Sequence, residues 1–401
     1  MKEIAKKLVA LGLSLGLLLG CTACGGQSAG NTQTTPEAEG FSGENTLAAE
    51  PNPIVTEQPE EAPAEEPAQE PASPAQEPAA TYIDPKAIVL TVNGEGVTWE
   101  EFRYWLYAGL SYQGIAIDEN TDWDQIVYGE LTMRDYALQD ALHSAVLYKV
   151  VDQSAAEKGI VATEENLQEI ESIVQSNIDY LGSEEAYREY LTANYLTDEL
   201  MRSMLLSSFH YSDLFAEMFG SQGEKLSDEE AILFGSENNY FRAKHILMAN
   251  EDAEGNPLDE EAMAEKLRTL EGVLAELKEA EDPVAVFDAR MWDFSEDPGL
   301  STNPEGYLFR RGEMVQAFQD AVEALEDYAF SDIVEMEYGY TIVMRLPLDP
   351  DGVAVSDASY GYTLRYNAAS AIFNSIVESW ISEAQVEYTA AYEQIDPATA
   401  W

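Results

Sequence analysis

Three polar residues in separate segments have side chains that suit a single hydrogen-bonding site. His245 lies in Phe-Arg-Ala-Lys-His-Ile-Leu, Asp297 in Phe-Ser-Glu-Asp-Pro, and Thr341 in Tyr-Gly-Tyr-Thr-Ile-Val-Met. An imidazole, a carboxylate and a hydroxyl can exchange hydrogen bonds and so form a network. A lone histidine on a strand is commonly a satisfied structural residue, so His245 indicates a site only together with the motifs around it.

An apolar pair lies between these polar residues. Met314 and Phe318 are four positions apart in Gly-Tyr-Leu-Phe-Arg-Arg-Gly-Glu-Met-Val-Gln-Ala-Phe. We expect a helix from Met314 to Leu325, in which residues four apart share one face. The two side chains then line one concave apolar surface, and the alternative is that both only pack in the core.

The chain lacks the patterns of several other chemistries. It has no zinc-ligand spacing, phosphate-binding loop or Ser-His-Asp arrangement. His143 and His210 have no partner at metal-ligand spacing, and we expect both to be structural or surface residues. No cysteine follows Cys24, which excludes a thiol nucleophile and a disulfide in the folded part.

The order and spacing of these motifs resemble a parvulin-type peptidyl-prolyl isomerase domain. The resemblance implies that His245 holds the inner histidine position and that Asp297 stands where the family has Asp or Cys. Thr341 replaces the second histidine that the family usually carries. We therefore expect His245, Asp297 and Thr341 to be the catalytic residues, with activity retained but reduced.

The same resemblance implies a pocket for the prolyl ring and no cofactor. Met314 and Phe318 fall at its walls, and Phe309 and Leu308 lie beside them. Gly306-Tyr307-Leu308-Phe309 is one residue longer than the family's Gly-aromatic-Phe strand. The reaction is rotation about the bond before proline, whose barrier is about 18–20 kcal/mol. A site accelerates it by binding the twisted amide more tightly than the planar one.

Charge predicts which substrates suit such a site. The loop after the first strand is Asn-Glu-Asp-Ala-Glu-Gly (250–255), whereas phosphate-directed parvulins have a basic cluster there. An acidic loop repels phosphoserine or Asp before the proline. We expect a neutral, apolar or basic residue at that position. The net charge of -54 also excludes nucleic acid and anionic headgroups as partners.

The first residues predict export and a lipid anchor. Lys2, Lys6 and Lys7 precede an apolar run from Leu8 to Leu19, which is too short to span a membrane and is typical of a signal peptide. Leu-Leu-Gly-Cys resembles a lipobox that ends at Cys21, with Cys24 as the rival lipidation site. The alternative is an ordinary secretory signal with two incidental cysteines.

The remaining patterns predict an α+β protein, mostly helical, with an inserted parvulin-like domain of antiparallel sheet surrounded by helices. The helical part resembles the chaperone region of PrsA-type and SurA-type foldases. We expect a strand at Ala87–Val92 and capping boxes at Thr98 with Glu101 and at Ser227 with Glu230. Five segments follow: signal peptide 1–20, acidic Pro/Glu/Ala-rich disordered tether 21–81, N-terminal helical module 82–236, parvulin-like domain 240–347, and a C-terminal helix 355–396 completing the helical module.

These expectations together describe a foldase anchored to the outer face of the cytoplasmic membrane. Its partners would be unfolded, newly exported polypeptides with X-Pro bonds. Two alternatives stay open: a holdase that keeps the parvulin fold only to bind peptides, and a structural envelope protein with a degenerate domain.

Overall fold

The computed structural model describes residues 82–115, 117–118, 121–252 and 255–401. The expected signal peptide, the lipidation sites Cys21 and Cys24 and the expected tether lie outside the described residues. Within these ranges, no helix is both long and apolar enough to cross a membrane.

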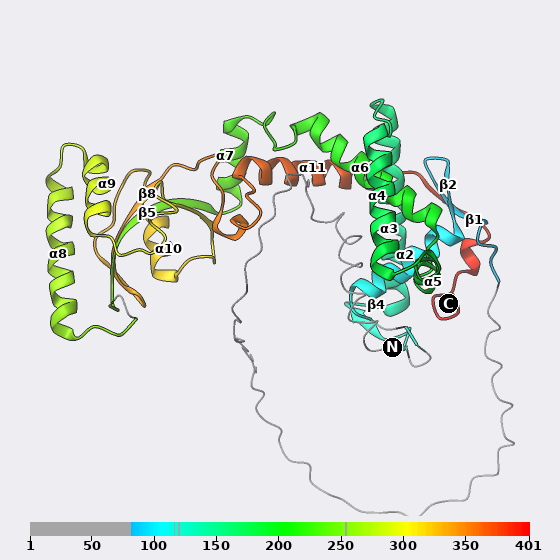
Figure 1. Cartoon of the computed structure of the whole chain (residues 1–401), viewed down its shortest axis with the longest axis horizontal. Helices are drawn as coiled ribbons and strands as arrows, with labels where there is room; N and C mark the ends of the chain where they lie inside the picture. Colours follow the sequence, from blue (N-terminus) through cyan, green and yellow to red (C-terminus); the bar gives the residue numbers. More distant parts are fainter. Residues whose placement is uncertain (1–81, 116, 119–120, 253–254) are drawn as a thin grey trace, which may run out of the picture. The chain divides into compact units, whose positions relative to one another are not determined.

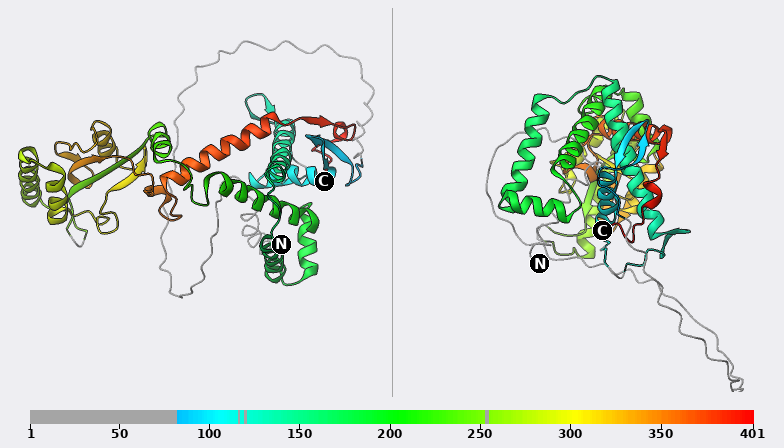
Figure 2. Two further views of the ribbon diagram at one scale, coloured as in Figure 1. Left: turned by 90° about the horizontal axis from the view of Figure 1, so that it is seen from above. Right: turned by 90° about the vertical axis from the view of Figure 1, so that its right-hand side faces the viewer.

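A three-stranded antiparallel sheet joins an early part of the described chain to a late one. Its order is β2-β1-β9, with β1 at Ile88–Val92, β2 at Glu95–Thr98 and β9 at Val386–Tyr388. Asn93 and Gly94 form the turn between β1 and β2 with positive φ angles of 52° and 85°. Figure 2 shows the red β9 beside the blue β1–β2 hairpin. The expected strand at 87–92 is therefore confirmed, and β9 is an addition to it.

Helices make up most of the rest of this part of the chain. Thr98 caps the first of them, since its hydroxyl accepts a hydrogen bond from the Glu101 N–H. The Glu101 carboxylate lies 3.5 Å from Lys149 instead of bonding back to Thr98, so the expected capping box is only half formed. The capping box of Ser227 with Glu230 is complete. The helices are α2 (Trp99–Tyr112), α3 (Met133–Glu157), α4 (Glu164–Leu181), α5 (Glu184–Ala193), α6 (Asp198–Phe219) and α7 (Asp228–Glu237), with a β3–β4 hairpin (Ile126–Tyr128 and Leu131–Thr132) before α3.

A late helix packs against these early ones. α11 (Leu364–Glu383) places Phe373 against Phe215 and Tyr211 of α6, with ring centroids 5.6 and 4.8 Å apart. The expected helix at 355–396 is too long, because Ala384 has an extended backbone that ends α11. Short 3-10 turns, η2 (Val355–Asp357) and η3 (Tyr392–Gln394), and the strand β9 occupy the remainder.

A second sheet of four antiparallel strands forms the α+β part. Its order is β6-β5-β8-β7, and β5 and β8 are the long central strands. Helices cover both faces, as Figure 1 shows for α8 and α9 on one side and α10 on the other. This arrangement confirms the expected fold class. The elements are β5 (Tyr240–Ala249), α8 (Glu260–Glu279), α9 (Pro283–Phe294), β6 (Tyr307–Arg310), α10 (Gln316–Glu323), β7 (Val334–Met336) and β8 (Gly339–Leu346).

Strand alternation places the side chains of β5 from Ala243 onward on one of two faces of the sheet. Ile246 and Met248 join the core with α8 and α9, around the fully buried Phe287. Ala243 joins the core with α10, around Phe309 and Phe318. Because successive side chains of a strand point to opposite faces, His245 lies on the α10 face.

Candidate functional site

Asp297 reaches His245 because the segment after α9 is tied to β5. The Glu296 N–H donates to the Leu247 carbonyl at 2.8 Å, and the Leu247 N–H donates to the Ser295 hydroxyl at 3.1 Å. These bonds hold the next residue beside the strand. The Asp297 carboxylate then lies 3.2 Å from Nε2 of His245, and both side chains are about nine-tenths buried, at 11% and 12% exposure. The two expected polar residues are therefore brought together.

The carboxylate of Asp297 is held by two further groups. The Tyr307 hydroxyl donates to one oxygen at 2.7 Å, and the Gly299 N–H donates to the other at 2.9 Å. A side chain at Gly299 would meet the Tyr307 hydroxyl, since an added Cβ would lie 2.0 Å from it. Glycine thus permits the tyrosine to approach.

These contacts keep Asp297 ionised. Burial alone would raise the pKa of its carboxyl, but the adjacent His245 and the hydrogen bonds from Tyr307 and Gly299 outweigh burial and lower the pKa to about 2. Burial and the neighbouring carboxylate raise the pKa of the Tyr307 phenol, which therefore remains a donor.

The His245 imidazole keeps its hydrogen-bonding capacity. Its short contact with Asp297 is electrostatic, and an ion pair when the ring is protonated. Within the described part of the chain, Nδ1 of His245 has no hydrogen-bond partner, and Nε2 has only the contact with Asp297. Buried polar atoms of this kind are uncommon in folded proteins and point to a partner from outside the chain or to a functional role.

An apolar wall stands next to the imidazole. The Phe318 ring meets the His245 ring edge-to-face at 5.3 Å, and Phe309 lies 5.7 Å from Phe318. Met314 packs in the same cluster and is partly exposed. Aromatic and thioether groups offer an adaptable apolar surface. The structure thus brings Met314, Phe309 and Phe318 to the same face as His245.

The helix that carries Phe318 begins later than expected. α10 starts at Gln316, because Val315 has an extended backbone with ψ of 135°. Met314 therefore precedes the helix and does not form a helical i, i+4 pair with Phe318. The Gln319 side chain holds the preceding turn instead, accepting from the Gly312 N–H at 2.6 Å and donating to the Met314 carbonyl.

Two of the expected residues do not contact this cluster in the expected way. Leu308 points to the opposite face of β6, where it is buried with Tyr240, Ala354 and Leu364. Thr341 pairs with Leu247 on the His245 face and is fully buried. Its hydroxyl donates to the Ile246 carbonyl at 3.1 Å, so it is used within the sheet.

Tyr307 is the residue of this site that sequence reasoning did not single out. It pairs with Ala243 across β5 and β6, which puts it on the His245 face, with ring centroids 5.9 Å apart. The available signal was its place after Gly306 in the irregular strand motif. Alternation along β6 then assigns Tyr307 and Phe309 to one face and Leu308 to the other.

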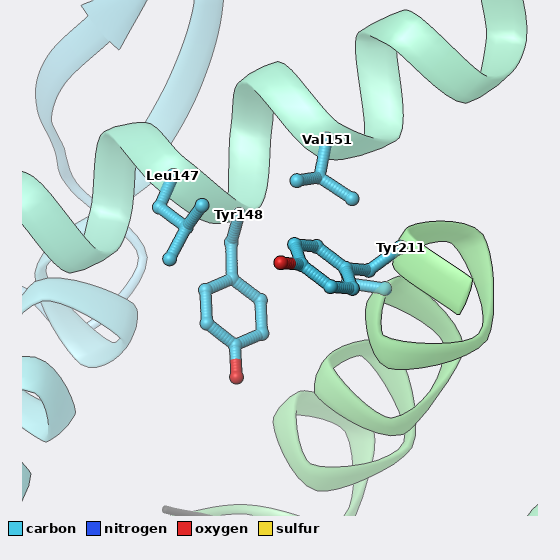
Figure 3. A pocket seen from close by; sticks show the side chains of 5 residues that line it. Leu147, Tyr148, Val151 and Tyr211 are labelled. Carbon is cyan, nitrogen blue, oxygen red and sulfur yellow. The ribbon is translucent and has the colours of Figure 1, made fainter. Parts of the chain in front are cut away.

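The other histidines belong to the helical part. His210 lies 2.8 Å from Asp152, which also accepts a hydrogen bond from Ser207, and His143 lies 3.9 Å from Glu378. Figure 3 shows the small hollow between α3 and α6 nearby. Among the residues described, no cluster of metal-ligating side chains occurs. The hollow is lined by Leu147, Tyr148, Val151, Ser207 and Tyr211, none of them in the α+β part.

Comparison with known proteins adds a family and several relatives. Residues 245–346 match the rotamase family of PPIC-type PPIase domains. The foldase protein PrsA of Caldanaerobacter subterraneus subsp. tengcongensis is 26% identical over 264 residues, which cover 64% of this chain and 72% of that protein. The chain therefore resembles a PrsA-type foldase with a parvulin-type domain.

Solved structures of PrsA proteins are also similar. The protein from Bacillus cereus is 17% identical, with 68% of this chain and 96% of that chain covered and a TM-score of 0.30. The protein from Bacillus subtilis is 18% identical, with 75% and 92% covered and a TM-score of 0.23.

Proposed function

We propose that this chain, with its PPIC-type PPIase domain and its similarity to PrsA, is a peptidyl-prolyl cis-trans isomerase and chaperone for exported polypeptides. The observation that supports this most is the His245–Asp297–Tyr307 group standing directly beside the apolar wall of Phe309, Phe318 and Met314. One surface thus provides an apolar contact for a prolyl ring and polar groups for the amide next to that ring.

The mechanism follows from what is lost when an amide twists. The planar bond is stabilised by resonance, and rotation removes that stabilisation without transferring any atom. The prolyl ring would pack on Phe318 and Met314. The carbonyl group of the residue before the proline would then lie close to His245. The ionised Asp297 fixes the imidazole so that its hydrogen bond is stronger to the twisted amide than to the planar one.

A protease-coupled assay on a proline tetrapeptide tests the activity. We expect the full chain to exceed the uncatalysed rate, and His245→Ala to lose at least about tenfold, which corresponds to about 1.4 kcal/mol of transition-state stabilisation. His143→Ala is the matched control, since this histidine is 40% exposed and belongs to the helical part. A rate equal to the uncatalysed one would overturn the proposal.

The same experiment separates the alternatives. A chain that suppresses aggregation of an unfolded client but has no isomerase activity, with or without His245→Ala, would be a holdase that kept the fold as a peptide clamp. Failure in both assays would favour a structural envelope protein.

We further propose that the acidic loop after β5 selects the residue before proline. Glu251 and Asp252 are both exposed there. A carboxylate or phosphate on the substrate would meet like charge. Leu-Pro and Lys-Pro peptides should therefore turn over faster than a Glu-Pro peptide. Equal or faster turnover of Glu-Pro would contradict this preference.

We propose that the helical module is completed by α11 and β9, with the parvulin-type domain inserted between α7 and η2. The packing of Phe373 on α6 and the pairing of β9 with β1 support this division. Residues 82–236 and 355–396 would then form one folding unit around residues 240–347. A fragment of residues 240–347 that folds and unfolds cooperatively on its own, and that retains isomerase activity, would support this division.

The lipid anchor is a separate proposal that rests on the sequence. Cys21 would carry the lipid and hold the chain on the outer face of the cytoplasmic membrane. Cys21→Ala should abolish incorporation of labelled palmitate, whereas Cys24→Ala should not. The reverse result would assign the anchor to Cys24. If neither the parent nor the variants incorporated palmitate, the proposal of a lipid anchor would be wrong.

A further inference from the structure

Residues 390–401 lie on the helical module without being part of its sheets. After β9, the hydrogen bonds of this segment stay within it or go to Thr389, such as Tyr392 N–H to the Thr389 carbonyl at 3.0 Å and Thr399 N–H to the Asp396 carbonyl at 2.9 Å. The exception is an ion pair between Asp396 and Arg134. The segment is therefore attached through side chains rather than through backbone pairing.

Trp401 makes one part of this attachment, beside Ile395 and Tyr392, whose ring meets that of Phe102 edge-to-face at 5.5 Å. Its ring stacks near that of Trp123, with centroids 6.3 Å apart and planes at 19°. It also lies 5.4 Å from Tyr195 and 6.3 Å from Tyr107. We call Tyr107, Trp123 and Tyr195 the aromatic cluster. Aromatic contacts of this kind contribute beyond the area that they bury.

Two members of the aromatic cluster, Tyr107 and Tyr195, are held by contacts that do not involve Trp401. Tyr107 and Tyr195 meet edge-to-face at 5.2 Å, and the Tyr107 hydroxyl donates to Asn194 at 3.0 Å. The Arg103 guanidinium lies over the Tyr195 ring at 4.9 Å. Tyr195 has a positive φ of 54°, a conformation that a tyrosine rarely adopts.

Trp401 leaves one of its own hydrogen-bonding groups unsatisfied on this surface. Its indole N–H is buried and has no hydrogen-bond partner among the described residues. A buried donor without a partner loses its hydration and gains nothing in return. A polypeptide that supplies an aromatic ring together with an acceptor would bind the same surface more favourably.

We infer that residues 390–401 are an internal ligand that occupies a client-binding surface made by the aromatic cluster and Arg134. The inference rests on the proposed chaperone function. The client segment that fits is an extended polypeptide in which a carboxylate precedes an aromatic residue, as Asp396 precedes Trp401. Arg134 and Arg103 supply local positive charge in a chain with only 21 basic residues.

Tethering explains how such a segment would regulate binding. An attached ligand acts at an effective concentration in the millimolar range, so a free client must compete with it. Weakening the internal ligand should therefore raise the apparent affinity for clients. If the segment were only core packing, its removal would lower stability and leave client binding unchanged or weaker.

The test uses the full chain in detergent and two probes. One is a fluorescein-labelled peptide with the sequence of residues 390–401, and the other is reduced, unfolded α-lactalbumin. Trp401→Ala should bind both probes about tenfold more tightly than the parent. The peptide carrying Ala in place of its Trp should not bind. Trp292→Ala, which removes a tryptophan that is 59% exposed on α9, should match the parent.

A second variant covers the case in which Trp401→Ala fails to fold. Asp396→Asn removes the ion pair from the internal ligand and leaves Arg134 and all the rings in place, so it should raise probe affinity in the same direction by a smaller factor. Equal binding of α-lactalbumin to the parent and both variants would overturn the inference and leave the chaperone proposal standing. No binding by any of them would overturn both.

Discussion

Asp297 shows how single residues build the polar part of the site. Its carboxylate receives hydrogen bonds from Tyr307 and Gly299 and stands beside His245. Hydrogen bonds to an ionised group are stronger than neutral ones, and they fix both the charge and its position. We therefore assign Tyr307 the role of a positioning residue that acts on His245 through Asp297.

Tyr307→Phe tests this role because it removes one hydroxyl and keeps the ring. We expect a loss of about 1.5–3 kcal/mol in the free energy of unfolding at pH 7, measured with urea, because a hydrogen bond to a charged group is lost. Isomerase activity should fall with it. Tyr328→Phe is the control, since that ring is 53% exposed. A Tyr307→Phe variant with parental stability and activity would contradict the assignment.

The effect of Tyr307→Phe should also depend on pH. The pKa of Asp297 is lowered from 3.8 to about 2 on folding, so its ionised form stabilises the folded chain above about pH 4. That stabilisation is lost as the pH falls towards 2. The difference in unfolding free energy between parent and Tyr307→Phe should therefore be constant from pH 5 to 8 and shrink below pH 4. A difference that grows on acidification would show that the carboxylate is not the partner.

Thr341 calls for a different prediction, because its hydroxyl bonds to the Ile246 carbonyl within the sheet. Thr341→Val keeps the shape and removes that bond, which should cost about 0.5–1.5 kcal/mol of stability. Its kcat/KM should change by less than about twofold, or about 0.4 kcal/mol. A large loss of kcat/KM at unchanged stability would instead make Thr341 part of the reacting network, as the family position of the second histidine suggests.

Sequence reasoning singled out His245, Asp297, Met314, Phe309 and Phe318, which the structure places close together, because each belongs to a local motif. It did not single out Tyr307, and it assigned Leu308 to the wrong face of the sheet. The reason is that the face on which a residue of a short strand lies depends on the register of that strand with β5. That register is fixed by pairs such as Ala243 with Tyr307, which are far apart in the chain. One step along a strand reverses every side chain, so an irregular motif leaves the facing residue undecided.

At the scale of elements, long-range pairing explains the other differences. β9 is three residues long and exists because it pairs with β1, so no local pattern indicates it. α10 begins at Gln316 rather than Met314 because Gln319 holds the preceding turn through the Gly312 N–H. By contrast, the capping box of Ser227 with Glu230 was predicted and is formed, since a cap depends on residues that are close in the chain.

Gly306 directly precedes β6 and is the best place to test how that strand positions Tyr307 and Phe309. Its φ is 92°, and an added Cβ would lie 2.6 Å from the Ala243 carbonyl oxygen. Gly306→Ala should cost more than about 2 kcal/mol of stability, because strain and a backbone clash combine. Its isomerase activity should fall as well.

Gly312→Ala separates these two causes. Its φ of 98° is similar, but an added Cβ there meets nothing within 4 Å. Strain alone should cost about 1–2 kcal/mol. Equal losses for the two variants in urea unfolding would remove the clash with β5 from the explanation.

At the scale of the whole molecule, charge is the dominant property. The chain has 75 acidic and 21 basic residues, which gives the net charge of -54. Such a field attracts basic polypeptides and repels acidic ones before any contact forms. The preference for Lys-Pro over Glu-Pro peptides thus has two possible sources, the overall field and the local loop that begins at Glu251.

Ionic strength and one substitution distinguish these sources. The ratio of kcat/KM for Lys-Pro to Glu-Pro peptides should be largest at about 0.01 M salt and approach one near 1 M, where the screening length falls to about 3 Å. Glu251→Gln should lower the ratio at low salt, because this carboxylate lies in the loop directly after β5. Glu387→Gln, an equal charge change at an exposed position of β9, should not. Equal effects of the two substitutions would assign the preference to the overall field, and a ratio that ignores salt would remove electrostatics from substrate selection.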